Sequence, residues 1–310
     1  MTDPTTDQVK QVTVGDVKIA YECFGDRADP PLLLVMGLAT QMLGWDERFC
    51  ARLADHGFHV IRFDNRDVGL STHLADAGVP DLGALVSGDP TAAPPPYTLL
   101  DMARDVDGLL DALGLDSAHV VGASMGGMIA QQLAIGHAHR VRSLTSIMST
   151  TSRDVGAARP EAMAALFLPP PTDADTAAER ALDVYRVIGS PGYPLDEVRL
   201  AEVARRAFAR GHDAAGVARQ FAAIVVSPDR TPGLRALDVP TLVIHGEDDP
   251  LVQVDGGRAT ADAVPGARLV VVAGMGHNLP EPLWAQLVDE IVAHARAAEE
   301  TREGVSPPTR

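Results

Sequence analysis

Apolar positions along the chain follow two periodicities, one typical of buried strands and one typical of the helices that pack on them. The run 32–36 is apolar on both faces and predicts a buried central strand of a parallel sheet, and the apolar run 269–273 also has the length of a strand. Stretches with apolar residues three or four apart, such as 99–113, predict amphipathic helices. The expected strands are 12–14, 17–24, 32–36, 59–63, 119–121, 141–147, 241–245 and 268–272, and the expected helices are 45–54, 99–113, 125–138, 256–264 and 283–298.

The alternation of strands and helices predicts a mostly parallel sheet covered by helices on both faces, but it stops between residues 148 and 237. Ala, Glu, Asp and Arg recur there with helical spacing, no strong strand occurs, and the Gly189–Gly192 segment divides two helices. Strand signals return at Thr241. We therefore expect a core of residues 1–147 and 238–298, an inserted helical cap (lid) at 148–237, a loop over 81–97, and a disordered tail at 299–310.

Composition and charge narrow the functional classes. The 310 residues suit one large domain with an insertion, and 46% of them are hydrophobic. The 26 basic and 42 acidic residues give a net charge of −16, which argues against binding to nucleic acid or to anionic membranes. No apolar run reaches the ~18 residues of a membrane helix. Residues 1–11 are polar and have no signal-like apolar stretch, so a cytoplasmic location without stable membrane association is expected.

A candidate nucleophile lies between the expected strand 119–121 and the helix that follows it. The segment Gly122-Ala123-Ser124-Met125-Gly126 fits the pattern G-x-S-x-G, which places a serine on a sharp strand-to-helix turn. The glycines two positions before and after Ser124 avoid clashes in that turn. The free N–H groups at the start of the helix favour a developing oxyanion. The alternative interpretation is an ordinary tight turn, but the position between strand and helix favours a nucleophile.

A serine nucleophile needs a base, and the base needs an acid to orient it. His277 follows the strand 268–272 in a glycine-rich segment that leaves room for an exposed ring. His245 also ends a strand, but the glycine after it indicates a structural position. The acid should follow the strand 241–245, and the candidates left open there by spacing are Glu247, Asp248 and Asp249.

The order Ser124, acid, His277 resembles the α/β-hydrolase superfamily. The resemblance implies a mostly parallel central sheet flanked by helices, with a helical lid. It also implies that the acid is Asp249, with Asp248 as the fallback, and that the backbone N–H groups of Leu38 and Met125 form the oxyanion hole.

Several further segments look like the aclacinomycin methylesterase-like, bacterial lipase/esterase branch of this superfamily. This branch has Met-Gly after the first central strand, as in Met36-Gly37, where many other members have His-Gly. It has Gly where this chain has Leu38, whose side chain would narrow the acyl side of the pocket. Met36 and Met275 are expected to line the substrate site. The segments that resemble this branch are 32–37, 44–45, 60–64, 66–67, 71–72 and 274–277. Asp64, Arg66 and Asp67, which lie in two of them, are expected to brace the loop beside the oxyanion site.

The resemblance implies a carboxylic ester hydrolase that forms an acyl-enzyme on Ser124 and needs neither a metal nor an organic cofactor. Its partner would be a small-molecule ester, and the chain would be a monomer or homodimer. A serine on this strand-to-helix turn argues against dehalogenase and epoxide-hydrolase chemistry, because enzymes of this fold with those activities usually have Asp at that position. The same three residues could also serve a lactonase, a C–C bond hydrolase or a cofactor-free perhydrolase, or remain in a binding protein with little turnover.

Overall fold

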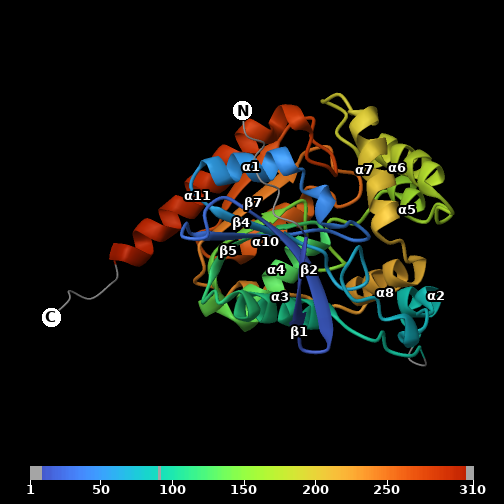
Figure 1. The fold of residues 1–310 in the computed structure, drawn as a ribbon, viewed down its shortest axis with the longest axis horizontal. Coiled ribbons are helices and arrows are strands. Elements are labelled where there is room, and N and C mark those ends of the chain that lie inside the picture. The colour runs from blue at the N-terminus through green and yellow to red at the C-terminus, as the bar shows by residue number, and fades with distance from the viewer. Residues whose placement is uncertain (1–8, 90–91, 305–310) are drawn as a thin grey trace.

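A single twisted sheet runs through the centre of the molecule in a computed structural model that describes residues 9–89 and 92–304 (Figure 1). Within those residues the sheet has eight strands in the order β1-β2-β4-β3-β5-β6-β7-β8. The first two strands are antiparallel to their neighbours and the rest are parallel, which confirms the predicted fold class. The strands are β1 (Lys10–Val14), β2 (Val17–Phe24), β3 (Pro31–Val35), β4 (His59–Phe63), β5 (Ala118–Ala123), β6 (Val141–Ile147), β7 (Thr241–Gly246) and β8 (Arg268–Val272).

Helices cover both faces of the sheet (Figure 1). On one face lie α3 and α4, and on the other lie α1 and α11. The helices of the molecule are α1 (Glu47–Asp55), α2 (Leu82–Ser87), α3 (Leu99–Leu113), α4 (Met125–Gly136), α5 (Pro160–Leu166), α6 (Ala174–Ile188), α7 (Glu197–Arg210), α8 (Ala214–Val225), α9 (Thr231–Leu234), α10 (Asp255–Ala263) and α11 (Trp284–Gly304), with short 3-10 turns at Met42–Gly44, Ala75–Ala77, Ala138–Arg140 and Glu281–Leu283.

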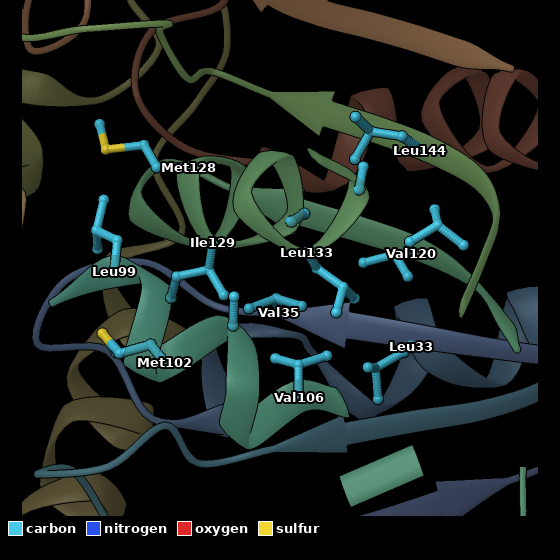
Figure 2. Close-up of a cluster of buried hydrophobic side chains, with 14 of the residues drawn as sticks. Leu33, Val35, Leu99, Met102, Val106, Val120, Met128, Ile129, Leu133 and Leu144 are labelled. Carbon is cyan, nitrogen blue, oxygen red and sulfur yellow. The ribbon is translucent and has the colours of Figure 1, made fainter. Parts of the chain in front are cut away.

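The strand β3 shows why the central runs are apolar throughout. Its five residues are all buried, and their side chains alternate between the two faces. Leu33 and Val35 pack against α3 and α4, whereas Leu32 and Leu34 pack against α1 and α11. Figure 2 shows part of the first of these clusters, in which labelled side chains of β3, β5 and β6 meet those of α3 and α4.

Local capping signals set the ends of helices, including one that the sequence interpretation missed. The helix α3 begins with a capping box between Thr98 and Asp101 and ends at Gly114, whose φ of 71° suits glycine. The expected loop over 81–97 contains the helix α2. The Asp81 side chain accepts from the first turn of α2, and Gly88 ends it with a left-handed φ of 71°. These caps stabilise a short helix that has no strong apolar periodicity.

The chain between β6 and β7 is helical throughout its regular structure. Every residue of 148–237 is described, and this span, called the helical insert below, contains α5 to α9 and no strand. Figure 1 shows α5, α6 and α7 grouped together to the right of the sheet, with α8 beside α2. The insert lies next to loops that follow parallel strands, since it bonds to Gln41 after β3 and to His277 after β8.

The expectation of a disordered tail at 299–310 is wrong for its first part. The helix α11 continues to Gly304, because the Ala-, Glu- and Arg-rich segment favours a helix. Glu299 anchors it, with a carboxylate oxygen 3.2 Å from Arg142 and 3.0 Å from His119. Residues 305–310 lie outside the described part. Within that part, none of the helices is both long and apolar enough to cross a membrane.

Candidate active site

Ser124 lies on the turn between β5 and α4 with a backbone φ of 56° and ψ of −121°. A non-glycine residue rarely has this conformation, which costs about 1–3 kcal/mol. Two positions before and two positions after Ser124, the neighbouring backbone leaves room only for glycine. A Cβ on Gly122 would lie 2.2 Å from the Gly126 carbonyl oxygen, and a Cβ on Gly126 would lie 2.1 Å from that of Val35. The close packing presents the serine hydroxyl at the tip of the turn.

Two backbone N–H groups predicted to face an oxyanion lie beside this serine. Met125 is the first residue of α4, and the first N–H groups of a helix have no acceptor inside the helix. The loop that carries Leu38 passes Ser124 closely, since a Cβ on Gly37 would come within 3.1 Å of the Ser124 Cβ. The Asn65 side chain supports this loop by donating to the Met36 carbonyl at 2.9 Å.

His277 connects the serine to a buried carboxylate. Its Nε2 atom lies 3.0 Å from the Ser124 hydroxyl oxygen, and its Nδ1 atom lies 2.7 Å from Asp249 Oδ2. The His277 side chain is 7% exposed and that of Asp249 is not exposed at all. Since a carboxylate can only accept, Nδ1 carries the proton, and Nε2 is left to accept one from the serine.

The three acidic residues after β7 have different surroundings. The other oxygen of Asp249, Oδ1, accepts from the backbone N–H groups of Leu251 and Val252 at 2.8 and 2.9 Å. Asp248 instead accepts from the Gly274 N–H at 3.0 Å, on the exposed side of the loop that carries His277. Glu247 is exposed. Only Asp249 of the three faces His277.

His245 is buried next to this carboxylate but has another partner. Its Nε2 atom donates to the Val252 carbonyl at 2.7 Å and lies 3.7 Å from Asp249 Oδ2. Burial lowers the pKa of His245, and hydrogen bonding to the carbonyl only partly opposes this effect. His245 is therefore a neutral core residue, in agreement with the structural role expected from the sequence.

The helical insert contacts the loop that carries His277 directly, between α6 and α7. The Ile188 carbonyl accepts from the His277 N–H at 2.7 Å, and the Ser190 hydroxyl accepts from the Gly276 N–H at 2.9 Å. The Gly192 N–H donates to the Gly274 carbonyl at 2.9 Å. In the sequence, the segment 189–192 indicates only a helix break, and nothing in it signals these contacts.

The three residues expected to brace the oxyanion region all form buried contacts, though not with one another. Asp64 accepts from the Met42 N–H at 2.7 Å and pairs with Arg210 of the insert at 2.5 Å. Arg66 forms a bidentate ion pair with Asp105, with both N–O distances at 2.6 Å. Each charged group is thus satisfied by a residue far away in the sequence.

Asp67 forms the most deeply buried of these ion pairs. Arg219 of α8 contacts both of its carboxylate oxygens at 2.8 Å, with neither side chain exposed, and the Tyr97 hydroxyl donates to it at 2.7 Å. Burial alone would raise the pKa of Asp67, but the hydrogen bonds from Arg219, Leu74 and Tyr97 hold it below its ordinary value.

The same region contains the one group of possible metal ligands among the described residues. Asp67, His73 and Asp213 bring ligand atoms within 4.8 Å of one another. The Arg219 guanidinium already contacts both carboxylates, at 2.8 and 2.9 Å. A cation placed there would be repelled by this fixed charge, so the chemistry of the group is that of an ion-pair network.

The two methionines expected to line a substrate site are core residues in this structure. Met275 is fully buried and so offers no surface to a substrate, contrary to the expectation. Met36 is nearly buried, and its Sδ and Cε atoms pack beside Gly44. Both lie in the apolar cluster under α1 and α11, because the loops after β3 and β8 turn these side chains inward.

The fold and this strand-turn-helix serine together have the architecture of α/β hydrolases. Residues 30–281 match the family model described as the alpha/beta hydrolase fold. The chain therefore belongs to the α/β-hydrolase family.

Comparison with individual proteins places the chain near the methylesterases, as the sequence motifs suggested. Rhodomycin D methylesterase DauP of Streptomyces sp. (strain C5) is 30% identical over 93% of this chain and 98% of its own length. The 3-oxoadipate enol-lactonase 2 of Acinetobacter baylyi is 29% identical over 87% of this chain and 91% of its own. The crystal structure of the enol-lactonase from Burkholderia xenovorans LB400 is similar with a TM-score of 0.69 and 26% identity, covering 93% of this chain and all of that one.

Proposed function

We propose that this protein is a serine hydrolase that cleaves a carboxylic ester through an acyl-enzyme intermediate on Ser124. One observation carries the proposal. His277 contacts the Ser124 hydroxyl through Nε2 and the buried Asp249 carboxylate through Nδ1, at 3.0 and 2.7 Å. A serine, a base and an orienting acid in this arrangement constitute an activated nucleophile. The likeness to a methylesterase and to enol-lactonases favours an ester as the substrate.

In the acylation step the Ser124 oxygen attacks the ester carbonyl carbon while His277 Nε2 takes the hydroxyl proton. Asp249 stabilises the imidazolium through its hydrogen bond to Nδ1. The carbonyl oxygen becomes an oxyanion and accepts hydrogen bonds from the Leu38 and Met125 N–H groups. As the carbonyl re-forms, the bond to the alcohol oxygen breaks, and that oxygen takes the proton from Nε2.

Deacylation repeats these steps with water in place of Ser124. His277 Nε2 removes a proton from the water as it attacks the acyl carbon, and the same two N–H groups hold the second oxyanion. When this intermediate collapses, the Ser124 oxygen leaves and recovers its proton from His277. The free acid is released, and the starting state is restored.

The helical insert serves in this proposal as a cap that sets substrate size. It contacts the loop of His277, and its surface includes apolar side chains that a hydrophobic acyl or alcohol group would contact. Phe167 is 54% exposed and packs edge-on against Phe221 of α8, with ring centres 5.3 Å apart. Leu38, on the loop beside Ser124, narrows the space for the acyl group.

A lactonase is the second candidate, because two of the similar proteins are enol-lactonases. A lactone is a cyclic ester, so the same residues would perform the same steps. The difference would be that the acid and the alcohol remain in one product.

The test is a panel of p-nitrophenyl esters of increasing acyl length, methyl esters with alkyl and aryl acyl groups, lactones and a dienone. We expect turnover of short-chain esters that declines as the acyl group grows. Preferential turnover of lactones would establish the second candidate, and of the dienone a C–C bond hydrolase. Labelling of Ser124 by a fluorophosphonate without turnover of any compound would contradict the proposal and indicate a binding protein.

A further inference from the structure

The loop beside Ser124 has a backbone conformation that needs external support. Ala39 has a φ of 59°, in the left-handed region that alanine seldom adopts. Such a conformation costs about 1–3 kcal/mol and persists only where its surroundings hold it. Asn65 holds the start of the loop through the Met36 carbonyl, but this contact lies before Leu38. After Leu38 the loop is held within itself by the Thr40 hydroxyl, which donates to the Leu38 carbonyl at 3.0 Å. A second group, from outside the loop, is needed to fix this peptide relative to the rest of the site.

That second group comes from the helical insert. Gln220 of α8 is fully buried, and its Oε1 atom accepts from the Ala39 N–H at 2.9 Å. Its Nε2 group donates to the Arg66 carbonyl at 2.8 Å, on the loop after β4. Both ends of the amide are therefore occupied by backbone groups of two different loops, which fixes the orientation of the side chain.

The helix that carries Gln220 is itself anchored at the preceding residue. Arg219 contacts both oxygens of Asp67, which follows Arg66 in the chain. The amide of Gln220 and the guanidinium of Arg219 thus form hydrogen bonds to adjacent residues of the same loop. With its base held in this way, Gln220 has little freedom to follow Ala39 if the oxyanion loop moves.

We infer that Gln220 is a positioning residue for the oxyanion hole. The Ala39 N–H belongs to the peptide group that follows Leu38, so holding it fixes the backbone on the far side of Leu38. Asn65 holds the near side, and together they aim the Leu38 N–H at the reacting oxygen. The inference rests on the proposed function and goes beyond it, because it makes the docked helix α8 a condition for a complete oxyanion hole.

The experiment compares Gln220→Met with a matched control, Gln131→Met. Gln131 is also a fully buried glutamine with both ends bonded, at 3.3 Å to Ser146 Oγ and at 2.9 Å to Arg230 Nε, but it does not contact the oxyanion loop. Methionine keeps the length of each side chain and removes both hydrogen bonds. The readouts are the melting temperature and the kcat and KM for p-nitrophenyl acetate.

We expect Gln220→Met to lower kcat by about tenfold to a hundredfold, with KM changed by less than about threefold, because loss of an oxyanion donor costs about 10²–10³ and misplacement costs less. Gln131→Met should lower the melting temperature but leave kcat within about threefold. A third variant, Gln220→Glu, should recover part of the loss. Burial favours the protonated form of the introduced carboxyl, which can accept from Ala39 and donate to the Arg66 carbonyl.

Unchanged kcat in Gln220→Met, or equal losses in Gln220→Met and Gln131→Met, would overturn the inference. If the wild type hydrolyses no ester, the proposed function fails, and the rate of Ser124 labelling by a fluorophosphonate replaces kcat, since its P=O oxygen occupies the same hole. Slower labelling of Gln220→Met alone would then support the inference. No labelling of the wild type would overturn both.

Discussion

Replacing Asp249 by Asn preserves the size of the side chain and removes one charge, yet the structure predicts a large loss of activity. Asp249 Oδ1 accepts two backbone N–H groups, so the amide oxygen of Asn must take that position. The NH2 group then faces His277 Nδ1, which lies 2.7 Å from the present Oδ2. Because NH2 can only donate, Nδ1 must lose its proton, and the ring proton moves to Nε2.

A proton on Nε2 blocks the reaction, since this atom faces the Ser124 hydroxyl at 3.0 Å and must accept its proton. The same change in a serine protease places the histidine in the wrong tautomer and lowers kcat by ~10⁴. We expect a loss of about that size in Asp249→Asn, which corresponds to ~5.5 kcal/mol of transition-state stabilisation.

The matched control is Asp248→Asn, one residue away. Asp248 contacts the Gly274 N–H at 3.0 Å on the exposed side of the loop, and an amide oxygen can accept the same bond. Its kcat should therefore stay within about tenfold of the wild-type value, since one hydrogen bond is worth ~1 kcal/mol. Both variants are assayed on one p-nitrophenyl ester at saturating concentration, with circular dichroism to verify folding. A large loss of kcat in Asp248→Asn together with a nearly wild-type kcat in Asp249→Asn would refute the reasoning.

Three further predictions concern the contacts around the site. Ser190→Ala should lower kcat about threefold to tenfold, because the two hydrogen bonds of its hydroxyl to the loop of His277, from the Gly276 N–H and to Asn278 Oδ1, are lost; an unchanged kcat in a steady-state assay would contradict this. Arg219→Met should lower the free energy of unfolding in urea by about 3–5 kcal/mol by leaving Asp67 buried and unpaired, whereas the exposed Arg186→Met should change it by less than about 1 kcal/mol; equal effects would show that burial is not the cause. Because burial lowers the pKa of folded His245, its contribution to stability is complete above pH ~6.5 and is lost as the pH falls below that value. The free energy of unfolding of His245→Gln should therefore fall less than that of the wild type between pH 7 and 5. An equal fall in both proteins would argue against this.

The sequence predicted the sheet and the residues at its strand ends because those signals are local. Ser124 and His277 each follow an apolar strand and lie among glycines, so a short window contains both the structural context and the reactive group. Asp249 needed the resemblance to a family, since spacing did not distinguish it from Asp248. The hydrogen bonds that separate the two depend on the direction of each side chain after β7.

Gln220 and Ser190 could not be found in this way. The contact from Gln220 to Ala39 spans 181 positions and that from Ser190 to Gly276 spans 86. Neither residue stands in a motif, and helix periodicity shows only that part of α8 is buried. The prediction that Met275 lines the substrate site was wrong for a related reason. Its position near His277 suggested the site, but tertiary packing directs its side chain into the core.

The central claim is that Ser124 carries the acyl group, and acid quenching during turnover of p-nitrophenyl acetate followed by peptide mass analysis tests it most directly. The account predicts a burst of one p-nitrophenol per enzyme and one added acetyl group on the peptide that contains Ser124. Both should be absent from Ser124→Ala, which should remain folded and lose activity by many orders of magnitude. Turnover by the wild type with no acetyl group on that peptide, or retention of a tenth of the activity in Ser124→Ala, would contradict the account.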